Sequence, residues 1–242
     1  MSSPPGPLAS APGAEQLRAG TDRALIGLFG GNLLEMGTFM YRNDDFFMLL
    51  AGAPDVAHDF LEKTTETHLR NLERFLTETG GLIDVILFGD DLGGQNGPLI
   101  SPAMYREFFK ARHERLFQRA KALAPGIKVL LHCCGGVREL LPDLISIGLD
   151  AINPVQITCS GMDAAGLKRD FGRDLTLWGG GCDTRAILPC ATPQQVREHV
   201  LRQLEILAPD GGFVFQQVHN IMADVPPENI VAIFDAVSEF NS

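Results

Sequence analysis

The feature that most constrains the fold of this chain is a repeated alternation of short apolar runs with longer segments of helical period. Apolar runs of roughly four to eight residues are typical of buried strands, and apolar residues three and four apart are typical of helices. A strand that follows a helical crossover runs parallel to the strand before it. The alternation therefore predicts an α/β protein with a parallel sheet. The predicted strands cover residues 24–29, 84–88, 127–131, 151–154, 175–178 and 212–218.

Polar and glycine-rich clusters follow all six predicted strands. In a closed barrel these strand ends share one face, whereas an open sheet concentrates chemistry at one crevice. The pattern favours a TIM-type (β/α) barrel, and since a full barrel has eight strands, six strand–helix units predict an incomplete one. The helices are predicted over 55–78, 103–123, 137–147, 163–171, 193–207 and 227–240.

Residues 1–20 begin with a stretch rich in Pro, Ser, Ala and Gly, which predicts a flexible N-terminal arm ahead of a barrel domain over 21–242. No apolar stretch approaches the roughly 20 residues that span a bilayer. The net charge of −10 argues against a nucleic-acid or anionic-membrane surface. Five irregularly spaced cysteines indicate a reducing cytoplasm rather than a disulfide framework.

His132 and Cys134 follow directly on the third predicted strand, just before a Gly-Gly turn. Side chains two apart on a strand share a face, so the imidazole and the thiol converge while Cys133 points away. An imidazole and a thiolate together suit a soft divalent metal, zinc first. The alternative is a packed strand end with a half-buried histidine and inert thiols.

A third ligand would complete a catalytic zinc site with one open position. His219 follows the last predicted strand, and closure of the sheet would bring it over the same mouth as the first pair. Alternatively, His219 only forms hydrogen bonds within its own loop. Cys182, after three glycines, is the rival third ligand.

Carboxylates and carboxamides follow the other strands. Asp90 and Asp91 are adjacent, so one is expected to face the mouth and the other to cap the next segment, or both to bind loop amides. We predict catalytic roles for Asp90, Gln156 and Asp183 around the open metal position. We predict substrate contacts for Glu35, Asp91 and Asn153.

From about Thr21 onward the chain resembles the uroporphyrinogen decarboxylase-like superfamily, which includes cobamide-dependent methyltransferases. The resemblance is carried, in order, by residues 84–93, 100–105, 132–135, 148–156, 179–183 and 226–230. It implies a TIM-type barrel. In the methyltransferase branch a His-x-Cys pair and a late cysteine bind zinc; His132 and Cys134 match the pair, and His219 stands at the late position.

The resemblance leaves three functions open. Zinc-dependent methyl transfer from a cobamide on a partner corrinoid protein to a thiol is favoured, because a metal-free decarboxylase has no obvious use for His132 and Cys134. Uroporphyrinogen decarboxylation would need several arginines for eight carboxylates, and only Arg42, Arg138 and Arg185 lie near strand ends. The third function is that of a non-catalytic or truncated barrel completed by a partner chain. Two missing strand–helix units also predict a homodimer.

Overall fold

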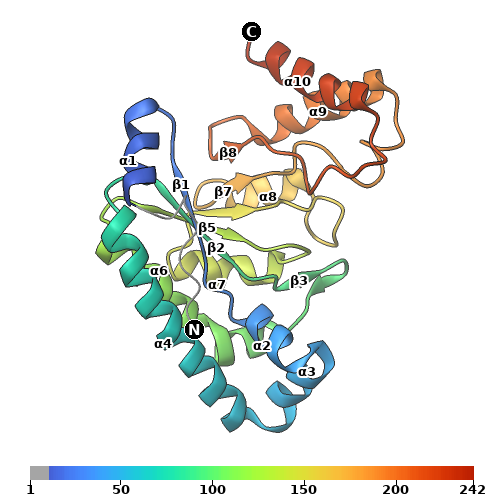
Figure 1. Cartoon of the computed structure of the whole chain (residues 1–242). Coiled ribbons are helices and arrows are strands. Elements are labelled where there is room, and N and C mark those ends of the chain that lie inside the picture. The colour runs from blue at the N-terminus through green and yellow to red at the C-terminus, as the bar shows by residue number, and fades with distance from the viewer. Residues whose placement is uncertain (1–10) are drawn as a thin grey trace. The chain divides into compact units, whose positions relative to one another are not determined.

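The computed structural model describes residues 11–242, so the first half of the predicted arm lies outside the described part (Figure 1). Six parallel strands form one sheet in the order β1-β2-β5-β6-β7-β8, which confirms the predicted parallel α/β fold. In the described residues the sheet has β1 and β8 at its edges and is not closed into a ring. The strands are β1 (Ile26–Gly30), β2 (Val85–Gly89), β5 (Lys128–His132), β6 (Ala151–Asn153), β7 (Thr176–Trp178) and β8 (Phe213–Val214).

The chain forms two compact units. The first unit comprises the described chain up to Asp91, then Ile100–His132 and Pro142–Asp150, and so holds β1, β2 and β5. Its helices are α1 (Ala11–Gly20), α2 (Leu34–Tyr41), α3 (Asn43–Gly52), α4 (Pro54–Thr79), α5 (Pro102–Met104), the π-helix η1 (Tyr105–Lys110), α6 (Ala111–Leu123) and α7 (Leu141–Ser146).

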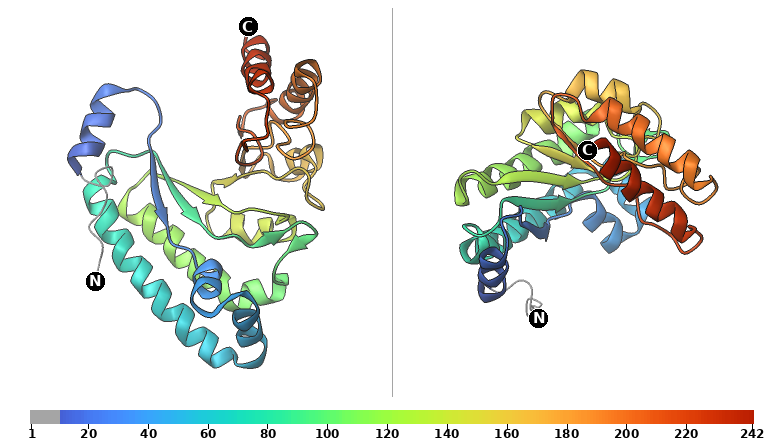
Figure 2. Two further views of the ribbon diagram at one scale, coloured as in Figure 1. Left: turned by 45° about the vertical axis from the view of Figure 1, so that its right-hand side comes forward. Right: turned by 90° about the horizontal axis from the view of Figure 1, so that it is seen from above.

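Helices α4 and α6 lie side by side in the first unit (Figure 2). Gly27 of β1 faces α4 so closely that a Cβ atom there would lie 2.9 Å from Phe75. The opposite face of the three strands carries Leu28, Leu87 and Leu130 in register. Leu28 on the edge strand β1 is 74% exposed, whereas Leu130 on β5 is only 1% exposed. This apolar face is therefore buried at β5 and exposed at β1.

The second unit comprises Leu92–Leu99, Cys133–Leu141 and Ala151–Ser242. It holds β6, β7, β8 and a small antiparallel hairpin of β3 (Gly93–Gly94) and β4 (Gly97–Pro98). Its helices are η2 (Arg138–Leu140), α8 (Ala164–Phe171), α9 (Pro193–Leu207) and α10 (Pro227–Phe240). A capping box of Thr192 and Gln195 starts α9 at the predicted residue. Helices α9 and α10 pack together around Val200, Ile233 and Ala236 (Figure 2).

The prediction of a flexible arm over 1–20 is wrong for its second half. Residues 11–20 form α1, because Pro12 lies in its first turn and residues 14–19 are of good helix propensity. Ala14 is buried, and Arg18 donates to the carbonyl of Leu82 over 3.1 Å and pairs with Asp84. The prediction extended the Pro- and Ser-rich composition of the first residues to residue 20 and so overlooked this helical segment.

Two further differences bear on the site. Helices α2 and α3 lie where no helix was predicted. Neither N-cap residue, Leu33 or Arg42, forms a side-chain cap, so the sequence lacks the usual signal for the start of a helix. The last strand is shorter than predicted and ends at Val214, so that His219 lies well beyond it in an exposed bend. Within residues 11–242, no helix combines the length and apolar character needed to cross a membrane.

Candidate metal centre

Three potential metal ligands gather at the carboxyl ends of β2 and β5. These strands are parallel neighbours, and Gly89 at the end of β2 pairs with His132 at the end of β5. Asp91 follows β2 and Cys134 follows β5, each just past its strand. One ligand atom from each of Asp91, His132 and Cys134 lies within 4.8 Å of the other two, and all three residues are half-buried.

The donor set fits zinc. A carboxylate oxygen, an imidazole nitrogen and a sulfur are the three ligand types that zinc uses in proteins. Bonds of about 2.0–2.3 Å at tetrahedral angles place such donors about 3.3–3.6 Å apart. The observed limit of 4.8 Å is therefore within small side-chain adjustments of a tetrahedral site. Three protein ligands leave a fourth position for a substrate atom.

Asp90 and Asp91 point in opposite directions. The carboxylate of Asp90 is fully buried and accepts hydrogen bonds from the backbone amides of Leu34 and Glu35, each over 3.0 Å. It therefore caps α2, which precedes it in the chain, and not the following segment that one of the two adjacent acids was expected to cap. Its second buried neighbour is His113, whose Nε2 lies 3.2 Å from a carboxylate oxygen. The predicted catalytic role of Asp90 stays a prediction.

Glu35 joins α2 to the metal centre. Its carboxylate accepts a hydrogen bond from the backbone amide of Asp91 over 3.2 Å and another from the side chain of Asn32. Burial raises the pKa of Glu35, and the charges of Asp91 and Asp90 raise it further, against the lowering effect of the Asn32 bond. Glu35 thus adds a third acid beside the pair predicted from sequence.

In the second unit the predicted site residues hold loops in place. Asn153 donates to the carbonyl of Trp178 over 3.0 Å and to the side chain of Gln216 over 2.9 Å. Gln156 accepts a hydrogen bond from the amide of Gly135, the residue after Cys134. Asp183 accepts hydrogen bonds from the amides of residues 185 and 186. Their predicted contacts with substrate stay predictions.

The two alternatives for the late metal ligand differ in their surroundings. Cys182 is fully buried, and burial raises the pKa of its thiol to about 12, with a further contribution from Asp183. A thiol of this kind resists the deprotonation that a metal ligand requires. His219 is exposed and is not part of the Asp91 group. Its role as third ligand stays a prediction, whereas the third member of the group is Asp91, for which a substrate contact was predicted.

Sequence reasoning missed the buried polar pair behind Asp90. The sequence analysis singled out neither His113 nor Tyr105; both are buried, and the Tyr105 hydroxyl lies 3.3 Å from His113 Nδ1. One signal was available: Phe109 and Phe117, four residues before and after His113, place the histidine on the apolar face of its helix.

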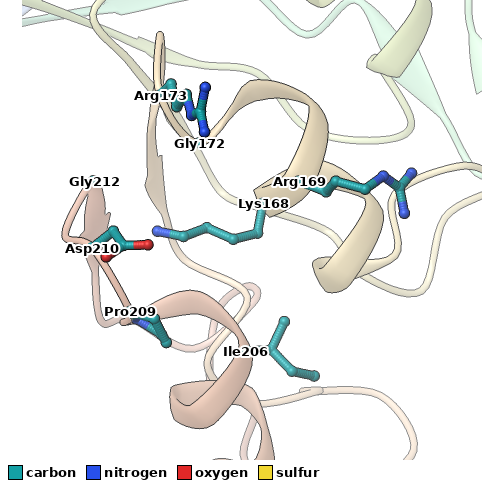
Figure 3. A pocket seen from close by; sticks show the side chains of 8 residues that line it. All are labelled: Lys168, Arg169, Gly172, Arg173, Ile206, Pro209, Asp210 and Gly212. Atoms are coloured by element: carbon teal, nitrogen blue, oxygen red, sulfur yellow. The ribbon is translucent and has the colours of Figure 1, made fainter.

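A separate cavity of about 770 Å³ lies in the second unit, at the amino-terminal ends of β7 and β8 (Figure 3). Its cations are largely engaged: Lys168 donates to the carbonyl of Gly211, and Arg169 pairs with Asp170. Asp210 lines the same cavity. None of the predicted site residues lines it, so it does not compete with the metal centre as the candidate site.

The parallel sheet and the side chains gathered beyond its strands place the chain among α/β proteins of the TIM-barrel type. The uroporphyrinogen decarboxylase (URO-D) family model matches residues 14–240, and the chain belongs to this family. The fold is similar to that of a methyltransferase from Methanosarcina mazei, with a TM-score of 0.72 and 20% sequence identity. That similarity covers 98% of this chain and 65% of the methyltransferase.

Curated relatives are uroporphyrinogen decarboxylases. The protein from Legionella pneumophila (strain Corby) is 28% identical over 66% of this chain and 42% of its own length. That from Thermus thermophilus is 28% identical over 79% of this chain and 51% of its own length. The chain thus spans about half the length of these relatives. The family is one of enzymes, with uroporphyrinogen decarboxylases among its members.

Proposed function

We propose that this protein is a zinc-dependent methyltransferase, which moves a methyl group between a methylated corrinoid (cobamide) and a thiol or similar acceptor. A partner corrinoid protein would carry the cobamide. The observation that carries the proposal is the grouping of Asp91, His132 and Cys134. These residues offer the donor set of a catalytic zinc site with one position left open.

Each part of the site has a role under this proposal. Asp91, His132 and Cys134 would hold the ion, and bound zinc would stabilise an acceptor thiol as its nucleophilic thiolate. Glu35 holds the amide of Asp91 and so limits the movement of that ligand. Gln156 holds the amide next to Cys134 in the same way. Asn153 and Asp183 are proposed to face the substrate.

Decarboxylation of uroporphyrinogen is the second candidate, supported by the names of the curated relatives. Binding eight carboxylates calls for several available arginines. Arg138 pairs with Asp170 and lies over the ring of Phe171. Arg42 pairs with Asp44 on the surface, and Arg185 donates to Gln95. These engagements favour the methyltransferase proposal.

Metal analysis of the purified protein tests the centre directly. We expect about one zinc ion per chain, and at least a tenfold loss of bound zinc in Cys134→Ser. Cys190→Ser is the matched control, because Cys190 is an exposed cysteine outside the group of ligands. Equal zinc in both variants would overturn the assignment of Cys134 as a ligand.

Activity separates the candidates. With methylcobalamin as donor and a simple thiol such as 2-mercaptoethanol as acceptor, we expect loss of methylcobalamin and formation of a thioether, both abolished in Cys134→Ser. Conversion of uroporphyrinogen with release of carbon dioxide, unchanged in Cys134→Ser, would instead support the decarboxylase. Absence of both activities, with zinc absent as well, would support a non-catalytic barrel.

A further inference from the structure

Helix α2 is capped by a residue far away in the sequence. Its own N-cap residue, Leu33, supplies no side-chain acceptor. The buried carboxylate of Asp90 instead accepts the amides of Leu34 and Glu35, one with each oxygen. An N-terminal turn left without an acceptor is strongly disfavoured when it is buried. The position of this turn therefore depends on where the Asp90 carboxylate is held.

Asp90 is held from behind by a buried imidazole. His113 is 2% exposed, and its Nε2 lies 3.2 Å from Asp90, without the geometry of a well-aligned hydrogen bond. Its Nδ1 lies 3.3 Å from the hydroxyl of Tyr105, which is fully buried. The imidazole also lies nearly parallel to the rings of Tyr105 and Phe117, with centroids 5.9 and 5.8 Å away. These two ring contacts restrict the plane of the imidazole.

A π-helical segment explains how Tyr105 and His113 meet. In a regular α-helix, residues eight apart are about 80° out of line, whereas residues seven apart are within about 20° of one another. The π-helix Tyr105–Lys110 absorbs roughly one extra residue in a turn, so eight positions behave as seven. Tyr105 and His113 therefore share one face. Insertions of this type often occur at functional sites.

Asp90 and Asp91 together hold both ends of Glu35. Asp90 holds its backbone amide, and the backbone amide of Asp91 holds its carboxylate. Resting on the proposed metal centre, we infer that Asp90, His113 and Tyr105 form a positioning relay that sets Glu35, and through it the ligand Asp91, for metal binding. Partners one layer behind the ligands commonly tune metal affinity by about 10–100-fold.

Two readouts test the relay. In Asp90→Asn and Tyr105→Phe, hydrogen exchange should become about tenfold faster at the amides of Leu34 and Glu35, because their acceptor is weakened or displaced. Cobalt(II) titration should show about tenfold weaker binding and a shifted visible spectrum. Asp84→Asn is the matched control: Asp84 is another carboxylate of the first unit that accepts a backbone amide, that of Leu25, and it pairs with Arg18, away from the relay.

The outcomes separate the relay from the centre itself. If the wild type binds cobalt, and all three variants share its spectrum and affinity, the relay is overturned and the metal centre stands. If the wild type binds no cobalt or zinc, the metal centre is overturned, and faster exchange at α2 would show only a structural cap. A spectral shift as large in Asp84→Asn as in Asp90→Asn would overturn the relay, since it would report a general loosening of the first unit.

Discussion

The strand ends of the two units differ in what their polar side chains bind. In the first unit, Glu35, Asp90 and Asp91 are acids close to one another, and a buried histidine lies behind them. In the second unit, Asn153 and Gln156 are neutral carboxamides that bind backbone groups and another carboxamide. The first unit thus gathers three acids, whereas the second has one buried acid, Asp183, beside these two carboxamides.

This difference separates side chains that could bind a metal or exchange a proton from side chains that hold loops in place. Buried acids near one another are costly, because each raises the energy of the other's charged form. A bound cation or a proton can offset the repulsion between such carboxylates, so clusters of this kind are candidates for functional sites. Carboxamides carry no such cost once their hydrogen bonds are made. The comparison therefore assigns the chemistry to the ends of β2 and β5.

The largest predicted difference is in the free energy of unfolding, between the Asp90→Ala and Asp183→Ala variants. Asp90→Ala removes the acceptor for two buried amides and leaves His113 without its carboxylate, so we expect a loss of about 3–5 kcal/mol in the free energy of unfolding. Asp183→Ala also removes an acceptor for two amides, but in a loop of neutral contacts, and should cost about 1 kcal/mol. Urea unfolding curves measure both. Equal losses would remove the energetic basis of the comparison.

A second test compares the two edge strands. Leu28 of β1 is 74% exposed, whereas Phe213 of β8 packs against the core of the second unit. We propose that a second copy of the chain covers the exposed face, with an apolar patch as the driving force. Leu28→Lys should raise the Kd of the dimer at least tenfold, which corresponds to about 1.4 kcal/mol of binding free energy. Light scattering over a range of concentrations measures this Kd. A wild type that is monomeric at micromolar concentration would refute this.

The smallest effect concerns two buried histidines. Burial lowers the pKa of His199 in the second unit and of His68 in the first. A folded-state pKa below the unfolded value of about 6.5 means that the unfolded chain binds more protons as pH falls. Each histidine thus contributes stability above that pH and loses it on acidification.

The two histidines should differ in size of effect. His199 Nε2 accepts a hydrogen bond from the amide of Asp183 over 3.2 Å, and protonation destroys that acceptor. His68 Nε2 pairs with the carbonyl of Asn32, a bond that the protonated ring keeps. The free energy of unfolding should fall between about pH 7 and pH 5. We expect this fall to be smaller in His199→Gln than in the wild type, by less than about 1 kcal/mol, and His68→Gln should reduce the fall by less still. The reverse order, in urea unfolding at both pH values, would contradict this assignment.

Much of the architecture was predictable because it follows from local periodicity. Helices α9 and α10 begin and end at the predicted residues, since a capping residue or proline starts each one and an amphipathic stripe continues it. The convergence of His132 and Cys134 followed from the two-residue repeat of a strand. Both inferences need only neighbouring residues.

The sequence by itself thus determined the order of the strands and two of the three ligands of the candidate centre, because periodicity and side-chain direction along one element are local properties. The tertiary structure alone decided that Asp91 completes the group while Asp90 turns away to cap α2. That choice depends on which helix supplies unpaired amides and on where His113 is buried, and both partners lie more than twenty residues from Asp90 in the chain. Local patterns contain no record of such contacts, since only the packed fold brings a helix terminus, a carboxylate and an imidazole together.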